Sequence, residues 1–474
     1  MLSTLIQKEL KAIIQSPKFV GSFAVCSILI LLSIFTGIRE YQAAVRQYQA
    51  ASQLVEEELR QETSWGRLTT KAYRAPDPIQ VFVSGLSYDI GRWSTISGQE
   101  GVKLLHSAYS DDPIFAVFRF VDFAFIVMFV LSLMAIQFTY DAVNGERESG
   151  TLKLVFSNAV PRAKYLVAKC AGAWLGLVLP LGIPVLLSVL IVLVAGVPMT
   201  LAHWFELAAL IALSLLLFTF FILLGVLVST VTRRSSVSFL VALLVWVAFV
   251  MIIPRAGVMA AGGLVDVPRL AEIESQREAY ANEKWTEHLN KITAGSFAPG
   301  DGSGLRAQDS LRKEMDKEID AYDQRLRENL RQSQIRQERL AWLLARLSPA
   351  SAYHLAAMAL AGNDTESKAR YEDVMSEYRD QFSRYVAAKQ EESGDPGGIR
   401  ITVEQDSDGE PKLTVDASRD RNGLKIEDLP RFNPPVRTLT SAVAPTVLDF
   451  GVLAFDILLV FAAAFVAFLK YDLR

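Results

Sequence analysis

The chain has 474 residues, of which 51% are apolar and 21% are charged, and its mean hydropathy of +0.26 exceeds that of water-soluble domains. Its 48 Lys and Arg and 51 Asp and Glu give a net charge of −3, so there is no basic field to gather nucleic acid. Two cysteines, Cys26 and Cys170, lie inside apolar runs, which excludes a disulfide scaffold or a cysteine zinc cluster. The composition predicts a membrane protein.

Six apolar stretches are long enough to cross a bilayer core, which needs about 20 helical residues. The first follows several charged residues and has no small-residue cleavage pattern after it, so we interpret it as a retained span rather than a signal peptide. The predicted fold class is an all-α polytopic membrane protein with six transmembrane helices and a mainly helical (α+β) extracytoplasmic domain. The expected spans are 19–38, 117–140, 166–195, 204–231, 237–253 and 446–469.

The short loops between the spans predict the orientation. An excess of Lys and Arg marks the cytoplasmic side of a membrane protein. If both termini are cytoplasmic, the inner segments hold eleven Lys and Arg, whereas the short outer loop 196–203 holds none. The long segments 39–116 and 254–445 then lie outside. The inner segments are 1–18, 141–165, 232–236 and 470–474.

The two long outer segments differ in character. The first starts with a polar helix near 40–62 and becomes irregular where Pro76 and Pro78 prevent regular helix. In the second, apolar residues recur every three or four positions and predict an amphipathic helix from about 305 to 347. A weaker stripe before the Gly-rich break at 298–304 makes this a helical hairpin, with a solvated charged coil as the alternative. Farther on, IRITVEQ and KLTVD alternate around DSDG, which predicts a β-hairpin.

The sequence shows no catalytic constellation. Residues 145–150, GERESG, have the glycine spacing of a phosphate-binding loop, but Thr151 and Leu152 stand where Lys and a hydroxyl residue must reach the phosphates. The inner segments are too short to build an ATPase domain. We therefore expect no catalytic or metal-binding residue in this chain, and any ATP hydrolysis in another chain. The four histidines have no ligand spacing: His106, His203, His288 and His354.

Within 141–165, residues from about Glu146 to Phe156 can form a short helix with one apolar side, which Ser157 to Pro161 then end. The stretch GERESGTLKLVFSNAVPRAKYLVAK resembles the coupling-helix region of ABC-2 type (type V exporter-like) transporter permeases. The N-terminal LIQKELKAIIQSPKF is similar to the amphipathic elbow helix that opens such permeases. LSPASAYHLAAMALAG, at 347–362, resembles the region after the ectodomain helices in the subgroup with large extracytoplasmic insertions. A juxtamembrane loop with chance similarity is the alternative.

The resemblance implies partners, a location and a set of residues. It implies a dimer with a second copy or a homologous permease, and two ABC ATPase subunits that bind ATP and Mg²⁺, while this chain holds no cofactor. It implies a multi-pass permease of a bacterial inner membrane, with the ATPase bound on the cytoplasmic side. Coupling to the ATPase is expected at six residues: Glu146, Glu148, Gly150, Thr151, Leu152 and Lys153.

Three positions inside the spans are further candidates. Asp456 lies near the middle of the last span, where an acid costs roughly 2.5 to 3.5 kcal/mol. It is either a polar point on the substrate path or the dimer seam, or a protonated or hydrogen-bonded packing residue, and we expect it to face the bundle or dimer interior. Gly172 and Gly176 form a GxxxG pattern that permits close helix packing.

The leading functional hypothesis is the membrane subunit of an ATP-driven exporter whose outer domain contacts cargo or another envelope protein. The alternative is a mechanical relay or scaffold, in which the ATPase moves the outer hairpin against a periplasmic or envelope partner and nothing crosses the membrane. A membrane sensor is disfavoured because no cytoplasmic signalling domain is present in the sequence, and a membrane enzyme because no catalytic constellation is.

Overall fold

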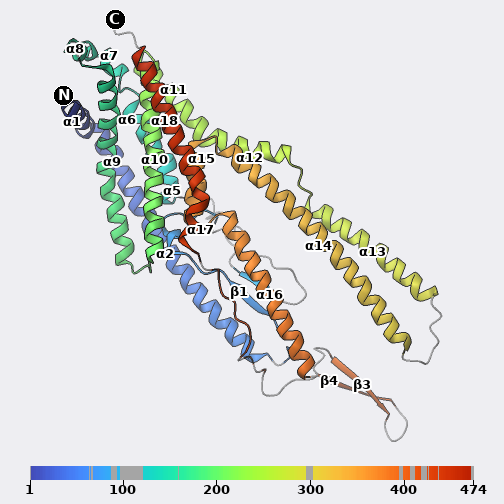
Figure 1. The fold of residues 1–474 in the computed structure, drawn as a ribbon. Coiled ribbons are helices and arrows are strands. Elements are labelled where there is room, and N and C mark those ends of the chain that lie inside the picture. Colours follow the sequence, from blue (N-terminus) through green and yellow to red (C-terminus); the bar gives the residue numbers. More distant parts are fainter. Residues whose placement is uncertain are drawn as a thin grey trace. The chain divides into compact units, whose positions relative to one another are not determined.

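In the computed structural model the chain forms two compact units, and Figure 1 shows the helices and strands of both. Unit 1 comprises Met1–Trp246 and Ala352–Arg474, and unit 2 comprises Val247–Ser351. Among the described residues, six helices are long and apolar enough to cross a membrane, which confirms the predicted all-α polytopic class. The structure describes residues 2–62, 64–65, 68–86, 93–96, 121–158, 160–294, 303–393, 399–405, 411–417, 424, 426, 428–435 and 437–470.

Unit 1 consists of long helices joined by short ones, with two small strand pairs. Its first half contains α1 (Leu2–Ile14), α2 (Pro17–Gln61), β1 (Thr70–Tyr73), a 3-10 turn (Pro78–Val81), β2 (Trp93–Ile96), α5 (Phe123–Phe125), a π-helical stretch (Ile126–Leu131), α6 (Ser132–Thr139), α7 (Asn144–Glu148), α8 (Thr151–Ser157), α9 (Arg162–Val194), α10 (Leu201–Val231) and α11 (Ser235–Val247). Its second half contains α15 (Pro349–Leu360), α16 (Thr365–Ser393), β3 (Ile399–Gln405), β4 (Pro411–Ala417), α17 (Leu439–Val443), a 3-10 turn (Ala444–Thr446) and α18 (Val447–Leu469).

The helix α10 forms the core of the spans in unit 1. It is the most deeply buried of the six, with 67% of its most apolar window inside the protein, and it packs against α6, α9 and α18. Its apolar side chains are supplemented by hydrogen bonds, since the Trp174 indole donates to Thr219 over 2.9 Å. Five residues earlier on α10, Ser214 shares a 3.2 Å hydrogen bond with Tyr353 between their hydroxyls.

The helix α2 is one continuous element of 45 residues, where the sequence indicated a span followed by a separate polar helix. Ser16 caps its start by accepting a hydrogen bond from the Phe19 N–H, and Pro17 occupies the first helical position. Residues 38–61 contain neither Gly nor Pro. At 1.5 Å per residue the helix is about 68 Å long, more than twice the ~30 Å thickness of a hydrocarbon core. Its second half therefore projects well beyond a bilayer.

The second expected span begins later than the sequence suggested. Its first helical residue is Phe123, whereas residues 117–120 of the expected 117–140 lie outside the described part of the chain. Asp122 caps this start, because one of its carboxylate oxygens accepts a hydrogen bond from the Phe125 N–H over 2.7 Å. The other carboxylate oxygen accepts from the N–H and the hydroxyl of Ser84, each over 2.9 Å. The acid at the end of this span is therefore held by hydrogen bonds.

The projecting half of α2 packs with α16 and β1–β2 around a small apolar core. β1 and β2 are antiparallel, with Thr70 opposite Ile96, a pairing that the sequence did not predict. The predicted hairpin of β3 and β4 is present, and its turn at 406–410 lies outside the described residues. The buried members of the core are Leu59, Trp65, Leu68, Ala72, Ile96, Met375, Tyr378, Phe382 and Leu424.

Unit 2 contains the predicted helical hairpin. After a π-helical stretch (Ala248–Ile252) and α12 (Ile253–Leu264), the chain forms α13 (Leu270–Ala294) and α14 (Ser303–Ala345). Both α12 and α13 pack along α14. The rings of Tyr280 and Tyr322 stack with centroids 4.0 Å apart, and Lys284 pairs with Glu318 over 2.6 Å. The hairpin is thus a packed structure and not a solvated coil.

Candidate functional site

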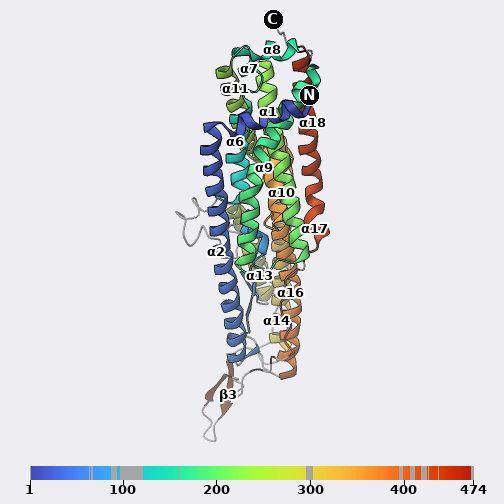
Figure 2. The ribbon, with the colours of Figure 1, turned by 90° about the vertical axis from the view of Figure 1, so that its left-hand side faces the viewer.

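The residues expected to couple to an ATPase lie on α7 and α8, two short helices that follow the second span. Within unit 1 these helices gather with α1 and the end of α18 at one end of the bundle, as Figures 1 and 2 show. Gly150 separates α7 from α8 and has a φ of +71°, a left-handed conformation that glycine adopts without strain. The Thr151 hydroxyl then donates to the Glu146 carbonyl over 3.2 Å, which tightens the turn.

Glu146 is the centre of a buried ion network. One of its carboxylate oxygens lies 2.7 Å from the Lys8 ammonium and 2.9 Å from that of Lys169. The other accepts a 2.5 Å hydrogen bond from the Tyr165 hydroxyl. Lys169 also lies 2.9 Å from a carboxylate oxygen of Glu9. The side chains of Glu146 and Lys169 are only 14% and 5% exposed. Glu146 therefore fastens α7 to α1 and α9, and its expected part in coupling stays a prediction.

The network is balanced in charge, with two ammonium groups against two carboxylates. Burial alone lowers the pKa of Lys8, but its hydrogen bond and charge attraction to Glu146 outweigh burial and raise that pKa above its usual value. Lys8 therefore stays charged at neutral pH. Buried charges are tolerated when each is paired and hydrogen-bonded, whereas a single unpaired one is costly. Removal of one member should therefore destabilise the rest.

The GxxxG pattern of the third span accommodates α1. A Cβ atom added at Gly172 would lie 2.5 Å from the Cβ of Glu9, and one at Gly176 would lie 3.4 Å from the Cβ of Ile13. The two glycines therefore form the groove in α9 into which α1 packs, and not a contact with another span of the same chain. This close approach brings Glu9 within reach of Lys169.

The first and last residues of α7, Asn144 and Glu148, bind the end of α10 and the start of α11. The Glu148 carboxylate accepts from the N–H of Ser235 over 2.9 Å and from its hydroxyl over 2.8 Å, and so caps α11. Asn144, which is fully buried, accepts from the Ser229 hydroxyl and donates to the Thr232 hydroxyl, each over 3.1 Å. Sequence reasoning missed Asn144 and Ser229, because nothing local marks two polar residues 85 positions apart as neighbours.

The helix α8 has one buried and one exposed side. Leu152 is 2% exposed, and the Phe156 ring packs 5.3 Å from the Tyr165 ring. Lys153 is exposed, and so is Leu154, at 67%. Of the six expected coupling residues, Glu148, Gly150 and Lys153 are thus exposed, Thr151 is half-buried, and Glu146 and Leu152 face inward. Leu154 was not among them, although its position two residues after Leu152 places it on the opposite side of the helix.

Asp456, on α18, lies at the border of the packed face of that helix. Leu453 and Val460, three and four residues away, are buried, whereas Leu458 is 66% exposed. Asp456 itself is half-buried. Its carboxylate makes no hydrogen bond or ion pair with any residue that the structure describes, so its expected role at a dimer seam or substrate path stays a prediction.

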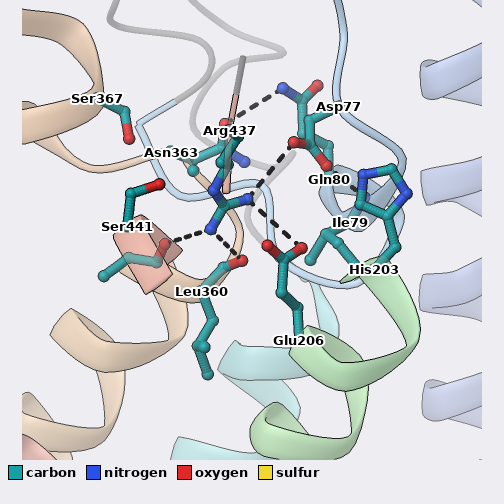
Figure 3. Close-up of polar contacts among 12 residues, drawn as sticks. Asp77, Ile79, Gln80, His203, Glu206, Leu360, Asn363, Ser367, Arg437 and Ser441 are labelled. Atoms are coloured by element: carbon teal, nitrogen blue, oxygen red, sulfur yellow. Dashed lines mark hydrogen bonds and ion pairs between the residues drawn. The ribbon is translucent and has the colours of Figure 1, made fainter. Parts of the chain in front are cut away.

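A second polar cluster, at the opposite end of the spans in unit 1, centres on Arg437 (Figure 3). The guanidinium lies 3.4 Å from a carboxylate oxygen of Asp77 and 3.6 Å from one of Glu206, which is 2% exposed. It also donates to the carbonyls of Ala359 and Leu360 over 2.7 and 2.6 Å. The cluster ties the segment before α17 to α10, to α15 and to the loop after β1. Sequence reasoning missed it, because its members lie up to 360 positions apart.

A family model described as ABC-2 family transporter protein matches residues 3–473. The match therefore includes all six spans, the α7–α8 segment and both long segments between spans. No curated protein matches the chain.

Proposed function

Because this chain belongs to the ABC-2 family of transporter proteins, we propose that a separate ATPase subunit drives it by docking on α7 and α8. Membership of the family makes the chain the membrane-spanning permease component of an ABC transporter, which works with ABC ATPase subunits. The observation that carries the docking proposal is the position of α8, whose residues Lys153 and Leu154 are exposed while Leu152 is buried and α7 is bound to the spans through Asn144 and Glu146. ATP and Mg²⁺ are bound by the ATPase.

The ion pairs and hydrogen bonds of α7 provide a route by which a displacement of α8 reaches the spans. Glu146 connects α7 to α1 and α9, and Glu148 and Asn144 connect it to the α10–α11 turn. A segment held at both ends cannot absorb a push by local bending. Closure of the docked ATPase on ATP therefore shifts α9, α10 and α11 together, which is the physical connection that coupling between distant sites requires.

The same proposal includes orientation and direction. The Lys and Arg excess of segments 1–18, 141–165 and 232–236 supports a cytoplasmic location for α7, α8 and both termini, in a bacterial inner membrane. The projecting half of α2 and its partners then lie outside, and we propose export toward that side. A second permease, identical or homologous, completes the translocation path.

Cysteine crosslinking tests the docking. The native cysteines Cys26 and Cys170 are 2% and 9% exposed, so they need not be removed. In a preparation that retains its ATPase under mild extraction, Lys153→Cys and Leu154→Cys should crosslink to the ATPase. Leu152→Cys, one position away but 2% exposed, is the matched control and should not.

The functional arm of this test replaces Leu154 by Asp. An apolar side chain at the centre of an interface contributes about 2 kcal/mol, so we expect a loss of roughly 30-fold in ATPase affinity without a change in the stability of the permease. Recovery of no ATPase with the chain, or equal crosslinking of all three cysteine variants, would reject docking on α8.

The mechanical relay is the second candidate, and the hairpin of unit 2 is the observation that favours it. The helix α14 has 43 residues and is about 64 Å long. On α13 the apolar side chains of Trp285 and Leu289 are 42% and 57% exposed. A spin label at Leu289 should change its mobility when ATP is added if the hairpin moves during the cycle. A label that stays unchanged while substrate is translocated would reject the relay.

A further inference from the structure

A cavity of about 1070 Å³ lies in unit 1. Two of the helices that line it, α2 and α16, extend to the end of that unit opposite α7 and α8 (Figure 1). Its walls are the projecting half of α2, the strand β1, the helix α16 and residues 424, 426 and 429–432. Sites for small molecules usually have volumes of about 300 to 1,000 Å³, so this cavity can hold an entire ligand of that kind. None of its lining residues belongs to α7, α8 or the Arg437 cluster.

One wall of the cavity is aromatic and rigid. Trp65 and Tyr378 are each 7% exposed and belong to the apolar core beneath. The Tyr378 hydroxyl donates to the Pro430 carbonyl over 3.0 Å, and its ring meets the Phe432 ring edge-on at 5.6 Å. The Trp65 ring meets that of Tyr385 in the same way at 6.0 Å. Such a preformed aromatic wall suits a flat ring or an acyl chain.

Four cations line the rim of the cavity. Lys389 pairs with Glu392 over 2.7 Å, and Lys71 pairs with Glu58 over 3.2 Å. Arg60 and Arg431 instead share one carboxylate, that of Glu56, at 3.0 and 3.7 Å. The two lysines thus each have a carboxylate of their own, whereas the two arginines have one between them.

The two arginines are the cations best placed to meet a ligand. Arg60 and Arg431 are 69% and 83% exposed, so they can turn toward a bound group at little cost. A guanidinium presents two parallel donors to a carboxylate, sulfonate or phosphate, which makes such pairs stronger than neutral hydrogen bonds.

We propose that this cavity binds a small amphiphilic anion, with its apolar body against Trp65 and Tyr378 and its acidic group at Arg60 and Arg431. The inference does not rest on ATPase docking, since it concerns binding by the permease alone. The same chemistry occurs in free organic acids and in anionic lipids, and the experiment separates the two sources.

The test uses three water-soluble naphthalenes of equal size that differ in charge: naphthalene-2-sulfonate, 2-naphthylmethanol and 2-naphthylmethylammonium. Each is titrated by equilibrium dialysis against the full chain in nanodiscs of zwitterionic lipid, with empty nanodiscs subtracted. We expect saturable binding of the sulfonate, about tenfold tighter than that of the alcohol, and the weakest binding for the ammonium.

Substitutions locate the site. Arg431→Gln and Arg60→Gln should each weaken sulfonate binding by about five- to tenfold and leave binding of the alcohol unchanged. Arg312→Gln is the matched control, because Arg312 is 65% exposed and also pairs with an acid four residues away, but lies on α14 of unit 2. It should leave all three affinities unchanged.

The source is identified by repeating the titration in nanodiscs that contain an anionic lipid. Unchanged sulfonate affinity supports a free organic acid. A loss of affinity that the anionic lipid causes in the natural chain but not in the Arg431→Gln variant supports competition by the lipid headgroup. Equal affinities for the three naphthalenes, tightest binding of the ammonium, absence of saturable binding, or an equal effect of Arg312→Gln would each overturn the proposal.

Discussion

Replacement of Lys169 by methionine tests whether the ion network around Glu146 stabilises unit 1. The Lys169 ammonium is 5% exposed and lies 2.9 Å from carboxylate oxygens of both Glu9 and Glu146. Methionine keeps the apolar stem but removes the charge. Glu146 retains Lys8 and Tyr165 as partners, whereas Glu9, whose side chain is 15% exposed, loses the cation paired with it.

The expected loss of stability follows from the Glu9 carboxylate, which Lys169→Met leaves buried without its cation. Removal of one partner of a buried ion pair costs about 3–5 kcal/mol. Because Glu9 keeps some contact with water, we expect a loss near the lower limit, about 3 kcal/mol in the free energy of unfolding, or more than 100-fold in the folding equilibrium. Adding Glu9→Gln to Lys169→Met removes the stranded charge and should recover about half of that loss.

The assay is unfolding of the purified chain in mixed micelles, followed by far-UV circular dichroism. Lys368→Met is the control in the same unit, because its pair with Glu372 spans 3.9 Å between side chains that are 43% and 37% exposed. Such exposed pairs contribute less than about 1 kcal/mol. A Lys169→Met protein as stable as the Lys368→Met control, or no recovery with Glu9→Gln, would refute the reasoning.

Three further outcomes are expected. Gly172→Leu should displace α1 and speed proteolysis of residues 1–18, whereas Gly182→Leu, on the same helix with open space around it, should not. Glu148→Ala removes the cap of α11 and should lower the free energy of unfolding in the same micelles. Asp456→Asn should leave the stability of the permease alone unchanged, and a loss above about 1 kcal/mol would reveal a partner within the chain.

Features of the fold that depend on local pattern were predictable from the sequence. The spans are long apolar runs, and the hairpin of α13 and α14 follows a helical period of apolar residues. The continuity of α2 was not predicted, because polarity changes near Arg39 while helix propensity does not: the following residues are mostly Ala, Gln, Glu and Arg. The pairing of β1 with β2 joins short strands 20 residues apart, for which four-residue patterns carry too little information.

The local structure of the candidate site was only partly predictable. One short helix was expected from about Glu146 to Phe156, whereas the chain forms two, α7 and α8, because Gly150 between them has a left-handed φ of +71°. The resemblance assigned Glu146 to coupling, which stays a prediction; in the structure its side chain pairs with Lys8 of α1 and Lys169 of α9, 138 and 23 positions away. Leu154 was missed because an apolar residue on a short helix is ordinarily counted toward the core. The covered side of α8 follows the apolar side that its sequence indicated, since Leu152 is 2% exposed and the Phe156 ring packs against that of Tyr165.

Because α2 is one continuous helix, a tilt of its membrane-spanning part also moves its projecting end. One end of this helix lies in the membrane-spanning bundle, and the other, from Tyr48 to Arg60, forms a wall of the cavity. Over a helix of about 68 Å, a tilt of about 5° at the Pro17 end moves the Gln61 end by about 6 Å, with no hinge to dissipate it. That displacement is larger than a hydrogen bond is long, so a small rocking of the span is enough to separate Arg60 from any group that it holds.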